Sequence, residues 1–215
     1  KGDKSYTRVR VNQPESIEAC LDIAQAECAQ LERIPSSPGK LAGVGYALAF
    51  QTMGLGRGVP DDSTNQLEWL PDGRILLRVG APDLGQGLFT AAAQITAEAL
   101  GVDLSQVMVE NIDTSKSPDG GVTCASRMTY MVGNSLQKAA AQAVQTLLEE
   151  TAHLLQTDSH QLCYHQGTVQ RIDQPGAPVI PVAEIISRLA ESEKKIQVNN
   201  TFSFPYGSEV PDHLP

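Results

Sequence analysis

The order of two glycine-rich loops and the segments around them constrains this chain more than any other sequence feature. The loops are residues 80–87 and 117–129, and each follows a short run rich in branched apolar residues, at 74–80 and 106–112. Apolar residues at helical spacing predict a helix over residues 88–100, between those two runs. A strand, a helix and a second strand in this order form a right-handed crossover whose two strands are parallel.

Parallel strands end at the same edge of a sheet, so both loops are expected to face one crevice. A second and longer helix is predicted from Ser126 to about Gln156. Each loop therefore leads into a helix N-terminus, where unpaired N–H groups and the helix dipole attract an anion. The predicted fold class is α+β (mixed α/β): a sheet with packed helices that contains a β-α-β unit with two Gly-rich loops on one edge.

The residue types in the loops suit a cradle for a phosphate-bearing cofactor. Gly85 and Gly87 flank Gln86 without β-carbons, so backbone can approach a ligand while the Gln86 amide donates and accepts hydrogen bonds. Hydroxyl groups gather near the start of the second helix, as helix caps and as phosphate donors, at Thr123, Ser126 and Thr129. A tight turn with an ordinary cap explains either loop alone equally well, because neither matches a P-loop or a dinucleotide fingerprint.

Other polar features favour structural interpretations. The Asp83 carboxylate is expected to accept N–H bonds within the first loop and stiffen its turn rather than transfer protons. Asp61 and Asp62 are adjacent in sequence and are expected on the solvated surface. Residues 54–58 are glycine-rich but lead into no helix, so a flexible connector is expected there.

The loops and their surroundings resemble the molybdenum-cofactor-binding part of the xanthine dehydrogenase and aldehyde oxidase family. The residues that carry the resemblance keep their spacing across both loops and the helix between them: Asp83 to Gly87, Thr90, Gln94, Ile95, Ala97, Glu98, Leu100, Gly101, Asp113, Thr114, Pro118, Gly121, Thr123, Ala125, Ser126, Arg127, Thr129 and Gly133. Weaker similarity extends over residues 43–50 and 71–75. The resemblance covers most of this chain but only part of the family's subunit.

This resemblance implies a molybdopterin-dependent oxidoreductase that hydroxylates a purine, an aldehyde or a related substrate with oxygen taken from water. Electrons would pass to iron–sulfur clusters and to FAD on other domains or subunits. By the same resemblance, the cofactor, as a mononucleotide or a dinucleotide form, would contact Gly85, Gln86, Gly87, Thr123, Cys124, Ala125, Ser126 and Thr129. No side chain need ligate the metal, because the dithiolene of the pterin holds it.

The family's general-base glutamate and its arginine-bearing loop near the metal are both expected outside this chain. No catalytic residue is therefore expected within it. We expect the 215 residues to be a fragment that is inactive and lacks the cofactor when isolated. The resemblance then implies several partners: the missing domains of the same subunit, iron–sulfur and flavin domains or subunits, and a second copy of the chain.

Composition limits the partners and the compartment. A net charge of −9 disfavours nucleic acid and anionic membranes, and no apolar run is long enough for a membrane span. Four cysteines without a Cys-x-x-Cys pattern favour a reducing compartment and a cytoplasmic location, with the periplasm left open. One domain over 1–215 is the simpler expectation; the alternative is two lobes, a core over about 36–157 and a small α/β lobe over about 158–215.

The remaining segments carry local predictions. They comprise helices over 14–33 and 182–192, strands over 41–52, 161–165, 168–172 and 195–199, and a hairpin turn at 71–73.

Two other functions stay open beside the cofactor site. One is a generic phosphate-binding or nucleotide-binding α/β domain, and the other is an assembly module whose long apolar helix packs on a missing domain or a second copy.

Overall fold

A computed structural model describes residues 15–30, 38–41, 43–49, 53–56, 59–172, 176 and 178–205. The chain forms two compact units, residues 1–51 with 206–215 and residues 52–205. The boundary expected near residue 157 lies inside the second unit, and the number of domains stays a prediction.

The first unit contains helix α1 (Glu15–Gln30), which lies within the helix predicted over 14–33. The strand predicted over 41–52 is wrong in its described residues, because residues 41 and 43–49 pair with no other strand. Its alternation rests on small residues such as Gly43 and Gly45, whose surroundings are empty within 4 Å. The larger apolar residues between them, Val44, Tyr46 and Leu48, stay exposed, so alternation alone does not form a sheet.

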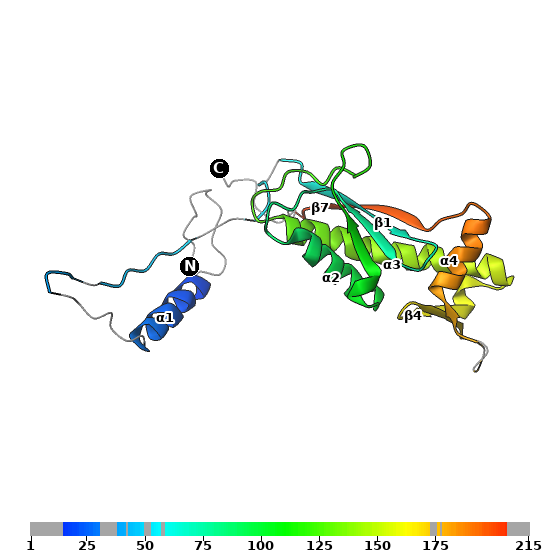
Figure 1. Ribbon diagram of the computed structural model, residues 1–215, viewed down its shortest axis with the longest axis horizontal. Helices are drawn as coiled ribbons and strands as arrows, with labels where there is room; N and C mark the ends of the chain where they lie inside the picture. Colours follow the sequence, from blue (N-terminus) through cyan, green and yellow to red (C-terminus); the bar gives the residue numbers. More distant parts are fainter. Residues whose placement is uncertain are drawn as a thin grey trace. The chain divides into compact units, whose positions relative to one another are not determined.

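A four-stranded sheet in the order β3-β2-β1-β7 forms the centre of the second unit (Figure 1). Strand β1 (Asp62–Trp69) pairs antiparallel with β2 (Ile75–Val79) and with β7 (Gln197–Ser203). Strand β3 (Val107–Glu110) pairs with β2 in parallel, with Ile75 opposite Val107. The parallel β-α-β unit predicted from the sequence is therefore confirmed, and β1 and β2 form the predicted hairpin.

Two helices pack on each other against one face of this sheet (Figure 1). Helix α2 (Leu88–Leu100) has the predicted bounds, and Gly101 ends it in the left-handed conformation with a φ of 63°. Helix α3 (Met128–Leu155) begins two residues later than predicted. Ala125 and Ser126 both have a φ of 51°, which a right-handed helix cannot include.

A second, three-stranded sheet follows α3. It consists of β4 (Leu162–His165), β5 (Thr168–Arg171) and β6 (Ile180–Pro181), all paired antiparallel, and helix α4 (Val182–Glu191) follows. Short 3-10 helices, η1 (Leu104–Gln106) and η2 (Ser159–Gln161), precede β3 and β4. The chain then returns to the larger sheet through β7, a long-range pairing that the sequence analysis did not predict.

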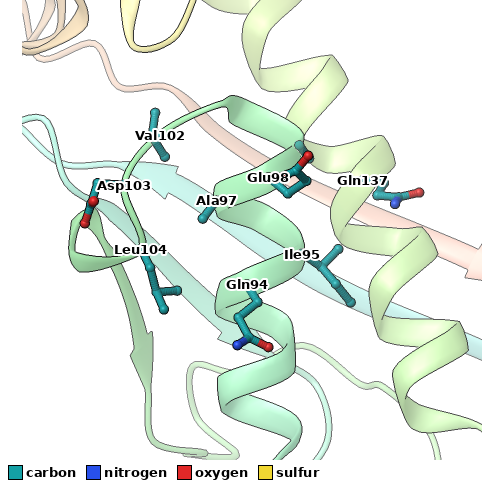
Figure 2. Close-up of a pocket in the computed structure, with 9 residues that line it drawn as sticks. Gln94, Ile95, Ala97, Glu98, Val102, Asp103, Leu104 and Gln137 are labelled. Carbon is teal, nitrogen blue, oxygen red and sulfur yellow. The ribbon is translucent and has the colours of Figure 1, made fainter.

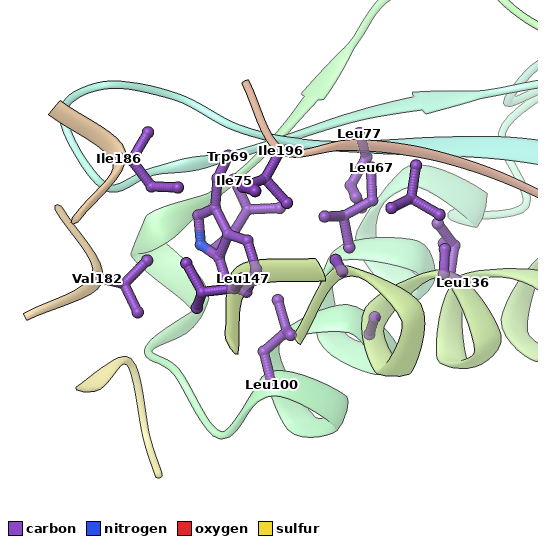
Figure 3. Packing of buried hydrophobic residues seen from close by; sticks show 14 of the residues in the cluster. Leu67, Trp69, Ile75, Leu77, Leu100, Leu136, Leu147, Val182, Ile186 and Ile196 are labelled. Atoms are coloured by element: carbon purple, nitrogen blue, oxygen red, sulfur yellow. The ribbon is translucent and has the colours of Figure 1, made fainter. Parts of the chain in front are cut away.

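The hydrophobic core lies between the larger sheet and α3, and it continues under α4 (Figure 3). Alternate residues of β1 and β2 point toward the helices, which is why Leu67, Trp69 and Leu77 are buried. The opposite face of the sheet is polar: the Gln66 Nε2 atom donates to Asn199 Oδ1 at 2.8 Å, and Arg78 pairs with Glu68 at 2.8 Å.

Among the described residues, none of the helices has the length and apolar content that a membrane span requires.

Candidate functional site

The two glycine-rich loops meet at one pocket beside the N-terminus of α3. The pocket has a volume of about 470 Å³ and is lined by Leu84, Gln86, Thr123, Cys124, Ala125, Ser126, Arg127, Met128 and Thr129. Most of the residues predicted for a cofactor site are therefore brought together. Gly85 and Gly87 belong to the same loop but are not among the lining residues.

Asp83 organises the first loop from within. Its Oδ1 atom accepts hydrogen bonds from the backbone N–H groups of Gly85 at 2.9 Å and Gly87 at 3.1 Å. Its Oδ2 atom accepts from the N–H of Phe89 at 3.2 Å, in the first turn of α2. The stiffening role expected for Asp83 is confirmed. The Asp83 carboxylate thus places a negative charge at the start of α2, where the helix dipole favours one.

The Gln86 amide also holds the loop together. Its Oε1 atom accepts from the N–H of Leu84 at 2.5 Å, and its Nε2 atom donates to the carbonyl of Pro82 at 3.1 Å. The side chain is exposed at the pocket, although both ends of its amide are bonded to the loop backbone. Gln86 therefore shapes the loop that faces the pocket.

The ionisation of Asp83 gives a pH-dependent test of this loop. The hydrogen bonds, that from Gly85 contributing most, hold the pKa of the Asp83 carboxyl below its usual value. A pKa that is lower in the folded state means that Asp83 stabilises the fold above its unfolded pKa of about 3.9. That stabilisation is lost as the pH falls through the folded pKa.

We therefore expect the Asp83 carboxyl carbon to titrate by NMR below the ordinary aspartate range. Asp83→Asn should speed amide exchange at Gly85 and Phe89 at neutral pH, because a neutral amide is a weaker acceptor. Glu98→Gln, an exposed change on α2, serves as the control and should leave both amides unchanged. A carboxyl that titrates in the ordinary range would contradict this description of the loop.

The second loop presents the start of α3 to the pocket. Arg127 is the N-cap residue of α3, and no side chain caps this helix end. The alternative interpretation of Ser126 as an ordinary helix cap is therefore wrong, since its left-handed backbone places it before the cap. The first N–H groups of α3 have no intrahelical acceptor, and they lie beside the lining residues Ser126 and Thr129.

One hydroxyl of the pocket lacks a hydrogen-bond partner. The Oγ1 atom of Thr123 is enclosed, and the described part of the chain offers it neither a donor nor an acceptor. Burying a hydroxyl without a partner costs free energy, so such an atom is suited to a ligand oxygen. Hydroxyls and amide N–H groups at a helix N-terminus are the donor set that a phosphate group requires.

The sequence analysis did not identify the ion pair that lies beside this site. Asp61 was expected on the solvated surface, which is wrong: it is 4% exposed, and its Oδ1 atom lies 2.6 Å from the Nε atom of Arg127. Arg127 was noted only for the resemblance. It is the only basic residue between positions 117 and 137, and it directly precedes α3. This isolated charge was the sequence signal that could have identified Arg127.

A larger pocket of about 780 Å³ lies along α2, away from the glycine-rich loops (Figure 2). Its walls come from α2, from the turn that leads into η1, and from Gln137 of α3. None of the residues predicted for the cofactor site lines it. The pocket beside the N-terminus of α3 is therefore the candidate functional site.

Comparison with known proteins identifies the family of the chain. The family model described as the molybdopterin cofactor-binding domain matches residues 19–213. The chain therefore belongs to the family of molybdopterin cofactor-binding domains, the molybdenum-binding part of xanthine dehydrogenase-type proteins.

Two curated relatives show the extent of the similarity. The gamma subunit of the 6-hydroxypseudooxynicotine dehydrogenase complex of Paenarthrobacter nicotinovorans is 27% identical over 179 residues, which cover 79% of this chain and 22% of that protein. One of the subunits of nicotinate dehydrogenase from Pseudomonas putida is 38% identical over 98 residues, which cover 46% of this chain and 8% of that protein. The chain thus spans less than a quarter of the length of either relative.

Solved structures share the fold. Quinoline 2-oxidoreductase from Pseudomonas putida 86 superposes with a TM-score of 0.55 and 24% identity, over 66% of this chain and 19% of that chain. The Cu,Mo-CO dehydrogenase gives a TM-score of 0.56 and 23% identity, over 66% of this chain and 18% of that chain.

Proposed function

We propose that the pocket beside α3 binds the phosphate end of molybdopterin, in its mononucleotide or dinucleotide form. The observation that carries this proposal is the meeting of both glycine-rich loops at a helix N-terminus that no side chain caps. The enclosed Thr123 hydroxyl without a partner fits a phosphate oxygen at this position. Ser126 and Thr129 would supply further hydroxyl donors, and the loop that contains Gly85, Gln86 and Gly87 would lie against the pterin.

In the intact protein, the bound cofactor supplies the redox chemistry of molybdenum. This domain contributes binding and orientation, since the pocket offers hydrogen-bond donors and small residues. Cys124 and Ala125 would form the part of the loop that lies nearest to the metal. We propose that the intact enzyme oxidises a purine, an aldehyde or a related substrate, in the cytoplasm, with the general base on another part of the protein.

The partners follow from the same proposal. Electrons from molybdenum would leave through iron–sulfur and flavin domains or subunits, and one similar protein is a subunit of a dehydrogenase complex. Further domains of the same subunit, and a second copy of it, are the other proposed partners. The net charge of −9 disfavours nucleic acid and anionic membranes, so the anion site is a local feature of the pocket.

A pair of substitutions at Ser126 tests the phosphate site by charge alone. The φ of 51° at Ser126 is tolerated by aspartate and asparagine better than by most residues. Ser126→Asp places a carboxylate where the phosphate would bind, and like charges about 4 Å apart repel by roughly 1–4 kcal/mol near a protein surface. We expect the affinity of the chain for pyrophosphate, measured by NMR titration, to fall by about tenfold or more.

Ser126→Asn is the matched control, because it has the shape of aspartate without the charge. It should retain pyrophosphate binding within a few-fold. In the intact subunit, the same aspartate variant should lose molybdenum, measured as metal content per chain. Equal binding by the two variants would refute the phosphate site, and it would favour the assembly module instead.

A further inference from the structure

The ion pair between Asp61 and Arg127 lies wholly inside the protein, beside the pocket. Both side chains are 0% exposed, and the Nε and Oδ1 atoms are 2.6 Å apart. The other nitrogens of Arg127 donate to backbone carbonyls: Nη1 to Gly120 at 3.1 Å and Val122 at 2.8 Å, and Nη2 to Asp62 at 2.7 Å. The Arg127 guanidinium therefore links Asp61 to backbone carbonyls of the second loop.

The loop that this pair holds contains an uncommon backbone conformation. Ala125 and Ser126 are consecutive residues with a φ of 51°, which is unfavourable for side chains other than glycine, asparagine and aspartate. Such a conformation persists only where the surroundings impose it. The N–H of Arg127 donates to the carbonyl of Cys124 at 3.2 Å, and the N–H of Gly54 donates to the carbonyl of Ala125 at 3.0 Å. The left-handed turn is therefore fixed from both sides.

Asp61 joins this turn to a third segment. While its Oδ1 atom accepts from Arg127, its Oδ2 atom accepts from the N–H of Leu55 at 2.8 Å. Gly54, the neighbour of Leu55, is buried. A flexible connector was predicted over residues 54–58. Its described residues are instead bonded to the second glycine-rich loop, through the Asp61 carboxylate and through the carbonyl of Ala125.

We propose that Asp61 and Arg127 are positioning residues of the phosphate site. The pair holds the Ala125–Ser126 turn, and thereby sets where the Ser126 hydroxyl and the first N–H groups of α3 point. Arg127 does not contact the phosphate itself, since its guanidinium is fully buried and is committed to Asp61 and three carbonyls. This inference rests on the proposed function of the pocket.

The test compares Asp61→Asn with Arg127→Lys in the full chain, with pyrophosphate as the probe. Lysine keeps the charge but cannot serve four acceptors spread around a planar guanidinium. A positioning role predicts that each variant weakens pyrophosphate binding by about tenfold, and that the double variant is no weaker than either single one. A direct contact instead predicts that Arg127→Lys retains most of the affinity while Asp61→Asn changes it little.

Asp62→Asn is the matched control, the same chemical change one residue away on an exposed side chain. It should bind pyrophosphate as the unmodified chain does. Amide exchange at Ser126 and Thr129 gives a readout that does not depend on the ligand. It should speed by about tenfold in Asp61→Asn and remain unchanged in Asp62→Asn. Unchanged exchange and affinity in folded Asp61→Asn would overturn the proposal.

A measurement on the unmodified chain keeps the inference testable if the variants do not fold. During a pyrophosphate titration, the amide signals of Ser126 and Thr129 should shift, while the side-chain Nε–H signal of Arg127 should stay in place. A large shift of the Arg127 signal would show direct contact and overturn the positioning role. If pyrophosphate shifts no signal at the pocket, the proposed function fails, and amide exchange still decides whether the pair holds the turn.

Discussion

Replacement of Arg127 by methionine is expected to lower the free energy of unfolding by about 3–5 kcal/mol, the usual cost of breaking a buried ion pair. Methionine leaves the buried Asp61 carboxylate without its cation, and it removes the donor to the carbonyls of Gly120, Val122 and Asp62. Urea denaturation followed by fluorescence measures the loss. Trp69, the only tryptophan, is buried in the core and reports on the unfolding of this unit.

Arg188→Met provides the control for that experiment. Arg188 also forms an ion pair of 2.6 Å, with Glu184, but the two side chains are 54% and 49% exposed. Its loss should cost less than about 0.5 kcal/mol, since exposed pairs contribute little. A loss below about 1 kcal/mol for Arg127→Met would contradict the buried ion pair described here.

Alanine at Gly80 is expected to lower the free energy of unfolding by about 3 kcal/mol, the upper range for overpacking a core. A β-carbon at Gly80 would lie 2.5 Å from the carbonyl oxygen of Thr64 and 2.7 Å from that of Pro118, and it would also meet the N atom of Gly120. All three atoms belong to the backbone and cannot turn away. The close approach matters because the N–H of Gly120 donates to the carbonyl of Gly80 at 2.8 Å, joining the starts of the two loops.

Gly45→Ala is the matched glycine substitution, because no atom lies within 4 Å of the position that its β-carbon would take and its φ is not left-handed. Its free energy of unfolding should stay within about 0.5 kcal/mol of the unmodified chain. Urea midpoints measured on both variants check the comparison. Equal midpoints would show that the two loops can separate without cost.

The parts of the fold that the sequence predicts well depend on local information. Helix α2 has the predicted bounds because its apolar residues repeat at helical spacing and Gly101 favours the left-handed conformation that ends it. The parallel pairing of β2 and β3 follows from the order of strand, helix and strand, since the handedness of such crossovers leaves few alternatives. The meeting of the two loops at one pocket is a consequence of that pairing.

The features that escaped prediction depend on residues distant in sequence or on backbone conformation. Asp61 is buried because Arg127, 66 positions later, neutralises its charge, and no local pattern around Asp61 reveals that partner. The left-handed turn at Ala125 and Ser126 moved the start of α3, because neither residue type by itself signals a positive φ. Residues 43–49 have the alternation of a strand, but Val44, Tyr46 and Leu48 stay exposed and the described residues offer them no partner strand.

The pairing of β1 with β7 has a consequence for the order in which the molecule is made. Gln66 and Asn199, which bond across these two strands, are 133 positions apart. On the ribosome, β1, both glycine-rich loops and α3 are all synthesised before β7. Contacts between such distant segments form slowly, because a long loop must close first. The sheet that supports the pocket is therefore completed by a strand that emerges after every residue of the pocket.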